Sequence, residues 1–257
     1  MGKDGLFMMK KTTKKYKVLI IISFLLILIL LCVFTKFPIV KIGKDFYTVF
    51  ATELELKDKY DEIIYDNNDV DSLKRMKFLK KLELINTKIT DLSFLEKMPY
   101  LEHFYCDGTF HAPITDWHYL QECKNMTVFC GEVVYINDLS VFSGLTNLEE
   151  LYIEYIYDAV LQVDDAKMLV SDLSGLETLV NLKKCYINGR DISDISQLKN
   201  CQKITHLGLR GIKPETDCSV LLELPELTEL NMDIGTLPDE IKEKLVAKGV
   251  EVYEYDY

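Results

Sequence analysis

The sequence lacks the motifs that mark the common catalytic sites. It contains no glycine-rich phosphate loop, no G-x-S-x-G and no H-E-x-x-H. No cysteine and histidine stand together in a context that would activate a nucleophile. We therefore expect no catalytic residues, no cofactor and no enzymatic activity.

Histidine is scarce, which limits the metal sites that the chain can build. The sequence has four histidines among 257 residues. His103 and His206 are too far apart in the repeated part of the chain to share one metal, whereas His111 and His118 are near each other around Asp116. No further cysteine or histidine follows at ligand spacing, so we expect no metal site.

Positive charge is also in short supply over most of the chain. The net charge is −11, and the first 34 residues contain six lysines against one acid, Asp4. The remainder therefore has 24 basic and 40 acidic residues, a net charge of −16. Because the phosphates of a nucleic acid need a basic face, we exclude a nucleic-acid partner.

One long hydrophobic run follows the N-terminal lysines. Residues 18–34, VLIIISFLLILILLCVF, carry no charge, and a helix of this length reaches roughly 25 Å, at the short end for a membrane span. We expect residues 1–17 to be a basic cytoplasmic tail and 18–34 to be a transmembrane helix. The positive-inside tendency places the N-terminus in the cytoplasm and the later residues outside it.

Two alternatives remain for this segment. A cleaved signal peptide requires small residues before the cut, and residues 32–38 offer no clear A-x-A pattern. A lipoprotein would use Cys32, but the preceding Leu31 is bulky where a small residue is expected. We favour an uncleaved anchor that spans the cell membrane once.

An internal repeat organises the rest of the chain. Residues 79–95, LKKLELINTKITDLSFL, combine alternating apolar residues with apolar residues spaced by three. The pattern returns at 126 and 182, and weaker copies start at 101, 148, 204 and 227, with an insertion at 154–168. Each copy predicts a strand and a short helical turn. Stacked copies then build a parallel sheet over one continuous core.

The repeat resembles the leucine-rich repeat family, most closely the 22-residue type of bacterial internalin-like surface proteins. The resemblance covers roughly residues 60–240 and implies an α/β solenoid with a parallel sheet on its concave face. It also implies protein binding, without a target. One departure concerns the family's asparagine after the strand, where this chain has Thr87, Thr109, Val134 and Arg190. The usual asparagine ladder is therefore absent or differently built.

Two recurring features have a structural interpretation. An aspartate precedes each helical turn, at Asp91, Asp116, Asp138, Asp172, Asp194 and Asp217. We expect these carboxylates to accept hydrogen bonds from free amides at the start of the turn, and not to carry metal or acid–base chemistry. Five of the six cysteines after residue 35 fall in inward positions and only Cys130 in an outward one, so we expect free thiols.

These features predict a linear organisation. We expect a stalk and N-terminal entry segment at 35–60, leucine-rich repeats at 61–237 and a C-terminal helix–strand cap at 238–257. Residues 61–78 are interpreted as a degenerate first repeat, with Ile64 in the place of Leu84. Pro238 near the start of the final helix and Gly249 after it support the cap.

The outward strand positions are the candidate binding residues. They form columns on the expected concave face: Lys81, Glu83, His103, Tyr105, Tyr152, Lys184, Tyr186 and His206. Three tyrosines share one slot, and tyrosine combines a large contact area with a polar tip that suits recognition. The alternative is that tyrosine is simply a good strand residue.

Two classes of function follow from these predictions. The first is a membrane-anchored protein that presents an extracytoplasmic recognition surface on a bacterial cell, with a protein as the expected ligand and a glycan as the other. The second is a structural or envelope-organising membrane protein that acts through self-association. A large apolar or aromatic patch on the concave face would favour the first, and self-association through the transmembrane helix or the solenoid edge would favour the second.

Overall fold

The structure is a computed structural model of the chain, and it describes residues 22–28, 38–59, 62, 64–107, 114–132, 134–154 and 169–256. The chain divides into two compact units, Met1–Val40 and Lys41–Tyr257. In the first unit, residues 22–28 are helical. The tail 1–17 and the other residues of the expected 18–34 span lie outside the described residues. Within the described ranges, no helix has the length and apolar character needed to cross a membrane.

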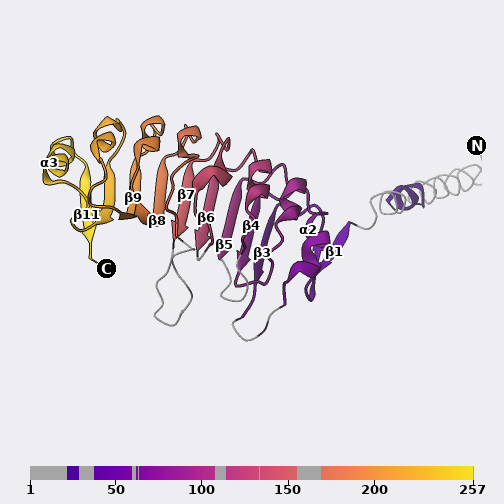
Figure 1. Ribbon diagram of the computed structural model, residues 1–257. Helices are drawn as coiled ribbons and strands as arrows, with labels where there is room; N and C mark the ends of the chain where they lie inside the picture. Colours follow the sequence, from indigo (N-terminus) through magenta and orange to yellow (C-terminus); the bar gives the residue numbers. More distant parts are fainter. Residues whose placement is uncertain are drawn as a thin grey trace, which may run out of the picture. The chain divides into compact units, whose positions relative to one another are not determined.

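A parallel sheet of nine strands runs through the described part of the second unit, in an order that follows the sequence (Figure 1). Its strands are β3 (Glu53–Lys57), β4 (Lys81–Ile85), β5 (His103–Asp107), β6 (Val128–Glu132), β7 (Glu150–Glu154), β8 (Lys184–Ile192), β9 (His206–Ile212), β10 (Glu229–Asp233) and β11 (Glu251–Tyr255). Strands β1 (Ile39–Ile42) and β2 (Asp45–Thr48) form a separate two-stranded sheet. The parallel sheet expected from the stacked repeats is thereby confirmed.

Short helical turns lie between the successive strands from β3 to β10. They are η1 (Asn67–Asp69), α2 (Val70–Leu73), η2 (Ser93–Lys97), η3 (His118–Glu122), η4 (Leu139–Phe142), η6 (Leu176–Thr178), η7 (Ser196–Asn200) and η8 (Ser219–Glu223). In Figure 1 these turns form a row beside the sheet. One apolar layer between the sheet and the turns is therefore shared by all coils.

The core consists of inward-facing columns that cross the sheet. One column contains Leu82, Phe104, Phe129, Leu151, Cys185, Leu207 and Leu230, which are paired in register and buried. Successive residues of a strand point to opposite faces. The alternate strand positions therefore point to the other face of the sheet, which we call the open sheet face.

Gly131 replaces a larger residue of the second inward column, and its neighbours fill the space. A Cβ atom at this glycine would lie 2.9 Å from both the Phe129 ring and the Val134 side chain. Phe129 in turn packs against the rings of Phe104 and Phe142, with centroids 5.9 and 4.9 Å away. The glycine accommodates an aromatic cluster in a core that has no room for one more side chain.

The recurring aspartates accept hydrogen bonds from the amide two residues ahead, as expected. The six bonds are Ser93 to Asp91 (2.8 Å), His118 to Asp116 (3.3 Å), Ser140 to Asp138 (2.9 Å), Ser174 to Asp172 (2.8 Å), Ser196 to Asp194 (2.9 Å) and Ser219 to Asp217 (2.9 Å). The hydrogen bond from the backbone amide lowers the pKa of Asp91, Asp194 and Asp217. The capping interpretation is confirmed, since each carboxylate satisfies an amide that the turn leaves free.

An asparagine ladder is present at a position other than the family's usual one. Asn125, Asn147 and Asn181 each stand three residues before a strand and donate to a backbone carbonyl of the preceding coil, at 2.7, 2.9 and 2.7 Å. These bonds link successive coils through side chains. They lie in exposed turns before the strands, so the expectation for the buried turns after the strands stays a prediction.

The sheet begins earlier than the repeat pattern indicates. Strand β3 lies inside the segment 35–60, which we expected to be a stalk and entry segment, and its Leu56 pairs with Leu84. The placement of Ile64 in the Leu84 position is wrong, because a longer loop separates β3 from its helical turn. After that loop, Asp66 forms an isolated bridge to Lys88, and the coil is back in register with the next one.

The C-terminal end contains helix α3 (Asp239–Ala247) and strand β11, which pairs in parallel with β10. Leu245 and Val250 are buried, and Gly249 between them has a φ of 87°, a left-handed conformation that favours glycine. The helix and strand place these apolar side chains beside the last coil. The insertion that we expected at 154–168 falls, except for Glu154, outside the described residues.

The six cysteines of the described residues are free, and only Cys130 is partly exposed. Burial raises the pKa of Cys123, Cys130 and Cys201 to about 12. The prediction of inward-facing free thiols is confirmed for this part of the chain. These thiols remain protonated at neutral pH and act as small apolar side chains.

Candidate binding site on the open sheet face

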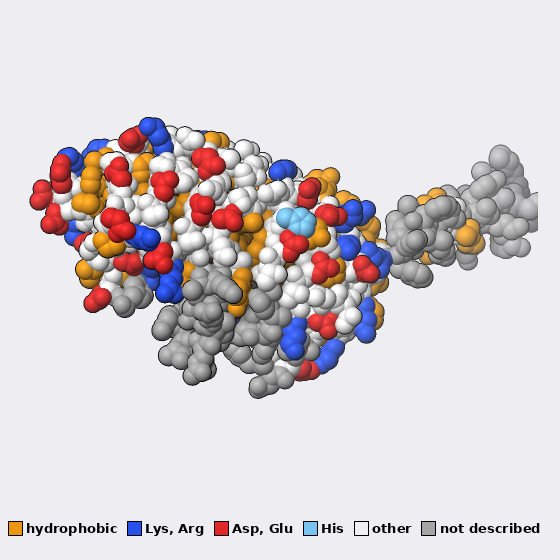
Figure 2. All heavy atoms as spheres, in the orientation of Figure 1, with side chains coloured by type: hydrophobic (Ala, Val, Ile, Leu, Met, Phe, Trp, Pro, Cys, Tyr) orange, Lys and Arg blue, Asp and Glu red, His pale blue; other side chains and the backbone are white. Residues whose placement is uncertain are grey.

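The open sheet face presents two rows of side chains that come from successive strands in register. The first row contains Lys81, His103, Val128, Glu150, Lys184, His206 and Glu229. The middle row contains Glu83, Tyr105, Cys130, Tyr152, Tyr186, Gly208 and Asn231. All eight candidate residues from the sequence lie in these two rows. Figure 2 shows acidic side chains spread along the viewed surface, with basic side chains between them.

Tyr152 and Tyr186 form a stacked pair in the middle row. Their ring centroids are 5.5 Å apart, and the ring planes differ by 7°. The two residues are direct register partners on β7 and β8. Tyr105 does not join this pair, because Cys130 stands between Tyr105 and Tyr152 in the row. The structure therefore divides the three tyrosines into a pair and a separate residue.

Hydrogen bonds to two carboxylates hold the tyrosine pair. The Tyr152 hydroxyl donates to Glu150 at 3.0 Å, and the Tyr186 hydroxyl donates to Glu229 at 3.1 Å. Partial burial and the bond to Glu229 raise the pKa of Tyr186 to about 12. For Tyr152, burial and the bond to Glu150 raise the pKa further still. Both hydroxyls are thus neutral donors at physiological pH, and their rings have a fixed orientation.

Lys184 shares Glu150 with Tyr152. Its ammonium lies 3.1 Å from the carboxylate. Burial raises the pKa of Glu150, but the hydrogen bonds from Lys184 and Tyr152 outweigh it and leave the pKa below its usual value. The carboxylate therefore stays charged at neutral pH and keeps both partners in place.

The other candidates lie toward the two ends of these rows. Lys81 and Glu83 form an ion pair at 2.7 Å on β4. His206 lies 3.8 Å from Glu229 and 2.8 Å from the Thr205 hydroxyl. His103 and His206 are on β5 and β9, with three strands between them, and His111 lies outside the described residues. Among the residues that the structure describes, no group of three or more His, Cys, Asp or Glu is arranged to hold a metal.

An acidic pair that sequence reasoning missed lies at the carboxyl end of β5 and β6. Asp107 and Glu132 are register partners on these strands. Burial, and then the charge of Glu132, raise the pKa of Asp107 to about 6, although Lys57 acts in the opposite direction. Both occupy the fifth strand position, which is continued by Glu154 on β7. The acidic residues at the fifth position of three successive strands are the sequence signal that could have predicted this row.

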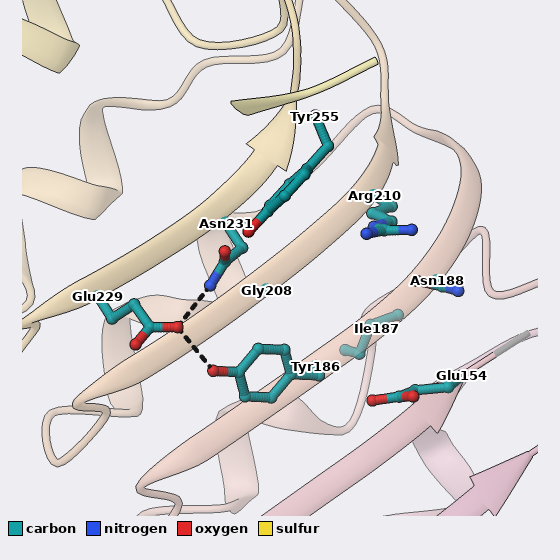
Figure 3. A pocket seen from close by; sticks show the side chains of 9 residues that line it. All are labelled: Glu154, Tyr186, Ile187, Asn188, Gly208, Arg210, Glu229, Asn231 and Tyr255. Carbon is teal, nitrogen blue, oxygen red and sulfur yellow. Dashed lines mark hydrogen bonds between the residues drawn. The ribbon is translucent and has the colours of Figure 1, made fainter. Parts of the chain in front are cut away.

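A recess beside Tyr186 is a second feature that sequence reasoning missed (Figure 3). The cavity has a volume of about 340 Å³, and its walls come from strands β7 to β11. Its other named lining side chains include Arg210, Glu229, Asn231 and Tyr255. Neither Arg210 nor Tyr255 was a candidate from the sequence. They converge only because β9, β10 and β11 are neighbours in the sheet.

Strands stacked in parallel, with one short turn per coil and buried leucine columns, define a leucine-rich-repeat solenoid. The chain is similar to the crystal structure of an internalin C2 from Listeria monocytogenes, with a TM-score of 0.57 and 19% identity over 83% of this chain and 85% of that one. A second internalin from the same organism is 18% identical over the same shares, with a TM-score of 0.37. No family model matches the chain, and no curated protein matches it. The likeness to internalin C2 shows the fold alone.

Proposed function

We propose that this protein is a membrane-anchored leucine-rich-repeat protein that binds a protein partner through its open sheet face outside the cytoplasm. The observation that carries the proposal is the stacked pair of Tyr152 and Tyr186. Its rings are half-buried and tied to Glu150 and Glu229, so they offer a large contact area with little motion left to lose on binding. The resemblance to internalin-like proteins also implies binding of a protein partner.

The arrangement of the surface also supports recognition over catalysis. The open sheet face combines an aromatic pair at its centre with charged residues around it, which is the pattern of a binding hot spot with a polar rim. Lys184 and Glu150 are already paired there, at 3.1 Å. Such pre-formed contacts keep the side chains in one geometry before a partner arrives.

The membrane anchor and the outward topology rest on the N-terminal sequence. Residues 18–34 are uncharged and follow six lysines, a combination typical of a single span with a cytoplasmic N-terminus. The test is protease treatment of intact cells that express the full chain with a C-terminal tag. Loss of the tag together with a protected N-terminus supports the proposal. A tag that survives on intact cells and is lost only after lysis contradicts it.

Partner binding is tested with the full chain carrying both Tyr152→Ala and Tyr186→Ala. Crosslinking on intact cells, followed by quantitative mass spectrometry, compares the captured proteins with those of the wild type. We expect the captured amount of at least one protein to be tenfold or more lower with the double variant than with the wild type. The matched control is Tyr119→Ala, because Tyr119 is a partly exposed tyrosine on η3, away from the open sheet face. Equal loss with the control, or no loss at all, would contradict binding through the tyrosine pair.

A different surface supports the second candidate, a structural protein that acts through self-association. Phe50, Phe78 and Tyr100 form a ladder of exposed rings at the turns before β3, β4 and β5, with centroids 5.8 and 6.3 Å apart. Association through this edge predicts that Phe78→Ser converts an oligomer of the detergent-solubilised full chain into a monomer. Sedimentation velocity distinguishes the two candidates, since binding through the open sheet face predicts no such change.

A further inference from the structure

The recess on the open sheet face is built around a glycine. Gly208 is the middle-row residue of β9, and a Cβ atom there would lie 2.4 Å from Cδ1 of Tyr186. The Tyr186 ring therefore lies over the glycine and leans toward β10, where its hydroxyl donates to Glu229. A glycine inside a strand weakens the sheet and marks a close approach of another group. Here it allows one ring to become the wall of a cavity.

The opposite wall of the recess comes from the last strand. Tyr255 of β11 lies beside Arg210 of β9, whose guanidinium carbon is 5.6 Å from the centre of the tyrosine ring. A cation above an aromatic face is an attractive pair that fixes both side chains. Figure 3 shows Tyr186 and Tyr255 on two sides of the opening, with Asn231 between them in this view and Arg210 to one side. Two aromatic groups thus flank a set of polar ones.

The polar groups supply donors and acceptors together. Asn231 donates to the Glu229 carboxylate at 2.7 Å, and the same oxygen accepts from Tyr186. Arg210 adds a guanidinium, which only donates, and Glu154 adds a carboxylate, which only accepts. The cavity of about 340 Å³ is at the lower end of the range for small-molecule sites. It has room for one small ring and not for a protein segment with secondary structure.

The recess has charges of both signs, which favours a neutral ligand over a purely anionic or cationic one. An anion would meet the carboxylates of Glu154 and Glu229 on an acidic protein, and a cation would meet the guanidinium of Arg210. A neutral ring with several hydroxyls uses the donors and the acceptors, and its C–H face packs on an aromatic side chain. We propose that the recess between Tyr186 and Tyr255 is a binding subsite for a neutral pyranose unit of a glycan. The subsite goes beyond the proposed protein binding, because it needs no protein partner.

The subsite is tested by titrating methyl pyranosides into the full chain in a detergent without sugar groups. The probes are methyl glucoside, methyl galactoside, methyl mannoside and methyl N-acetylglucosaminide, and saturation-transfer NMR detects binding. Tyr255→Ala has a matched control in Tyr253→Ala, since both tyrosines lie on β11 and both are 43% exposed, but only Tyr255 lines the recess. We expect at least one probe to bind and its affinity to fall at least tenfold in Tyr255→Ala only.

A second variant tests the role of the glycine. Gly208→Ala places a Cβ against the Tyr186 ring and forces the ring to move, so we expect it to abolish pyranoside binding. Thermal melting verifies that each variant is folded. The proposal is overturned if none of the four probes binds the wild type, if both β11 variants weaken binding equally, or if N-acetyl-arginine methylamide binds the recess in their place. Tyr255→Ala leaves the stacked pair of Tyr152 and Tyr186 in place, so pyranoside binding and partner capture are measured separately in this variant and either proposal can fail alone.

Discussion

The two faces of the same sheet follow different rules. On the inner face, every coil repeats the same solution, an apolar residue that is buried against its neighbours, as Leu82 and Leu151 show. On the open face, each coil has its own side chain, so that Tyr152, Gly208 and Asn231 occupy equivalent places. The repeated positions of the inner face therefore stabilise the fold, whereas the variable positions of the open sheet face are available to bind a ligand.

The aspartates that cap the helical turns are structural residues, like the apolar residues of the inner face. Asp91 and Asp194 perform the same task in different coils, with bonds of 2.8 and 2.9 Å to the following amides. A recurring carboxylate is easily mistaken for a functional site. Its recurrence at one slot, together with one structural partner in each coil, identifies it as part of the framework.

The largest effect is expected from breaking the inner face at its aromatic cluster. Phe129→Ala removes a fully buried ring that packs against Phe104, Trp117 and Phe142. A cavity of this kind costs about 3–5 kcal/mol of the free energy of unfolding. Urea denaturation followed by circular dichroism measures it. A loss below about 1 kcal/mol would show that the inner column is not the source of stability.

A smaller effect is expected from removing one cap. Asp194→Ala loses the bond from the Ser196 amide and costs about 1 kcal/mol at pH 7. The folded pKa of Asp194 is lowered, so the contribution of its charge is present above the unfolded pKa and is lost as pH falls through the folded value. The difference from the wild type shrinks below about pH 4. The control is Glu215→Ala, in an exposed turn. We expect it to leave the midpoint of the urea unfolding transition unchanged.

The smallest effect has the opposite sign and lies at the edge of the open face. Asp107 has a folded pKa of about 6, so the native state binds more protons than the unfolded state between about pH 4 and 6, and stability falls as pH rises through that window. Asp107→Asn should raise the free energy of unfolding at pH 7.5 by up to roughly 1 kcal/mol, because the half-exposed carboxylate is screened by solvent. At pH 4.5 the gain should vanish. An equal gain at both pH values contradicts this explanation, and Glu226→Gln is the exposed control.

The sequence predicted the residues of the inner face more completely than the binding features of the open sheet face. Leucine spacing is enough to predict strands such as β4 and β8, because a buried column allows few alternatives. It missed β3, since the loop between β3 and its helical turn is longer than the one after β4, the copy used to define the repeat. The rows that contain Lys81 and Tyr186 also follow from strand alternation.

The recess could not be found in the same way. It needs a side chain that is absent at Gly208, a ring that leans over that position from β8, and a tyrosine that reaches it from β11. These contributions come from separate strands, and no local pattern connects them. Tyr255 lies in the alternating segment VEVYEYDY, which predicts only a strand.

The most direct test of the division between the two faces is the free energy of unfolding of the Tyr152→Ala and Tyr186→Ala double variant beside Phe129→Ala. The tyrosine rings are half-buried, and a stacked pair adds about 0.5–1.5 kcal/mol. We predict that the double variant loses less than half of what Phe129→Ala loses and unfolds with the same denaturant dependence. A loss equal to that of Phe129→Ala would contradict the account, because the open face would then be part of the framework.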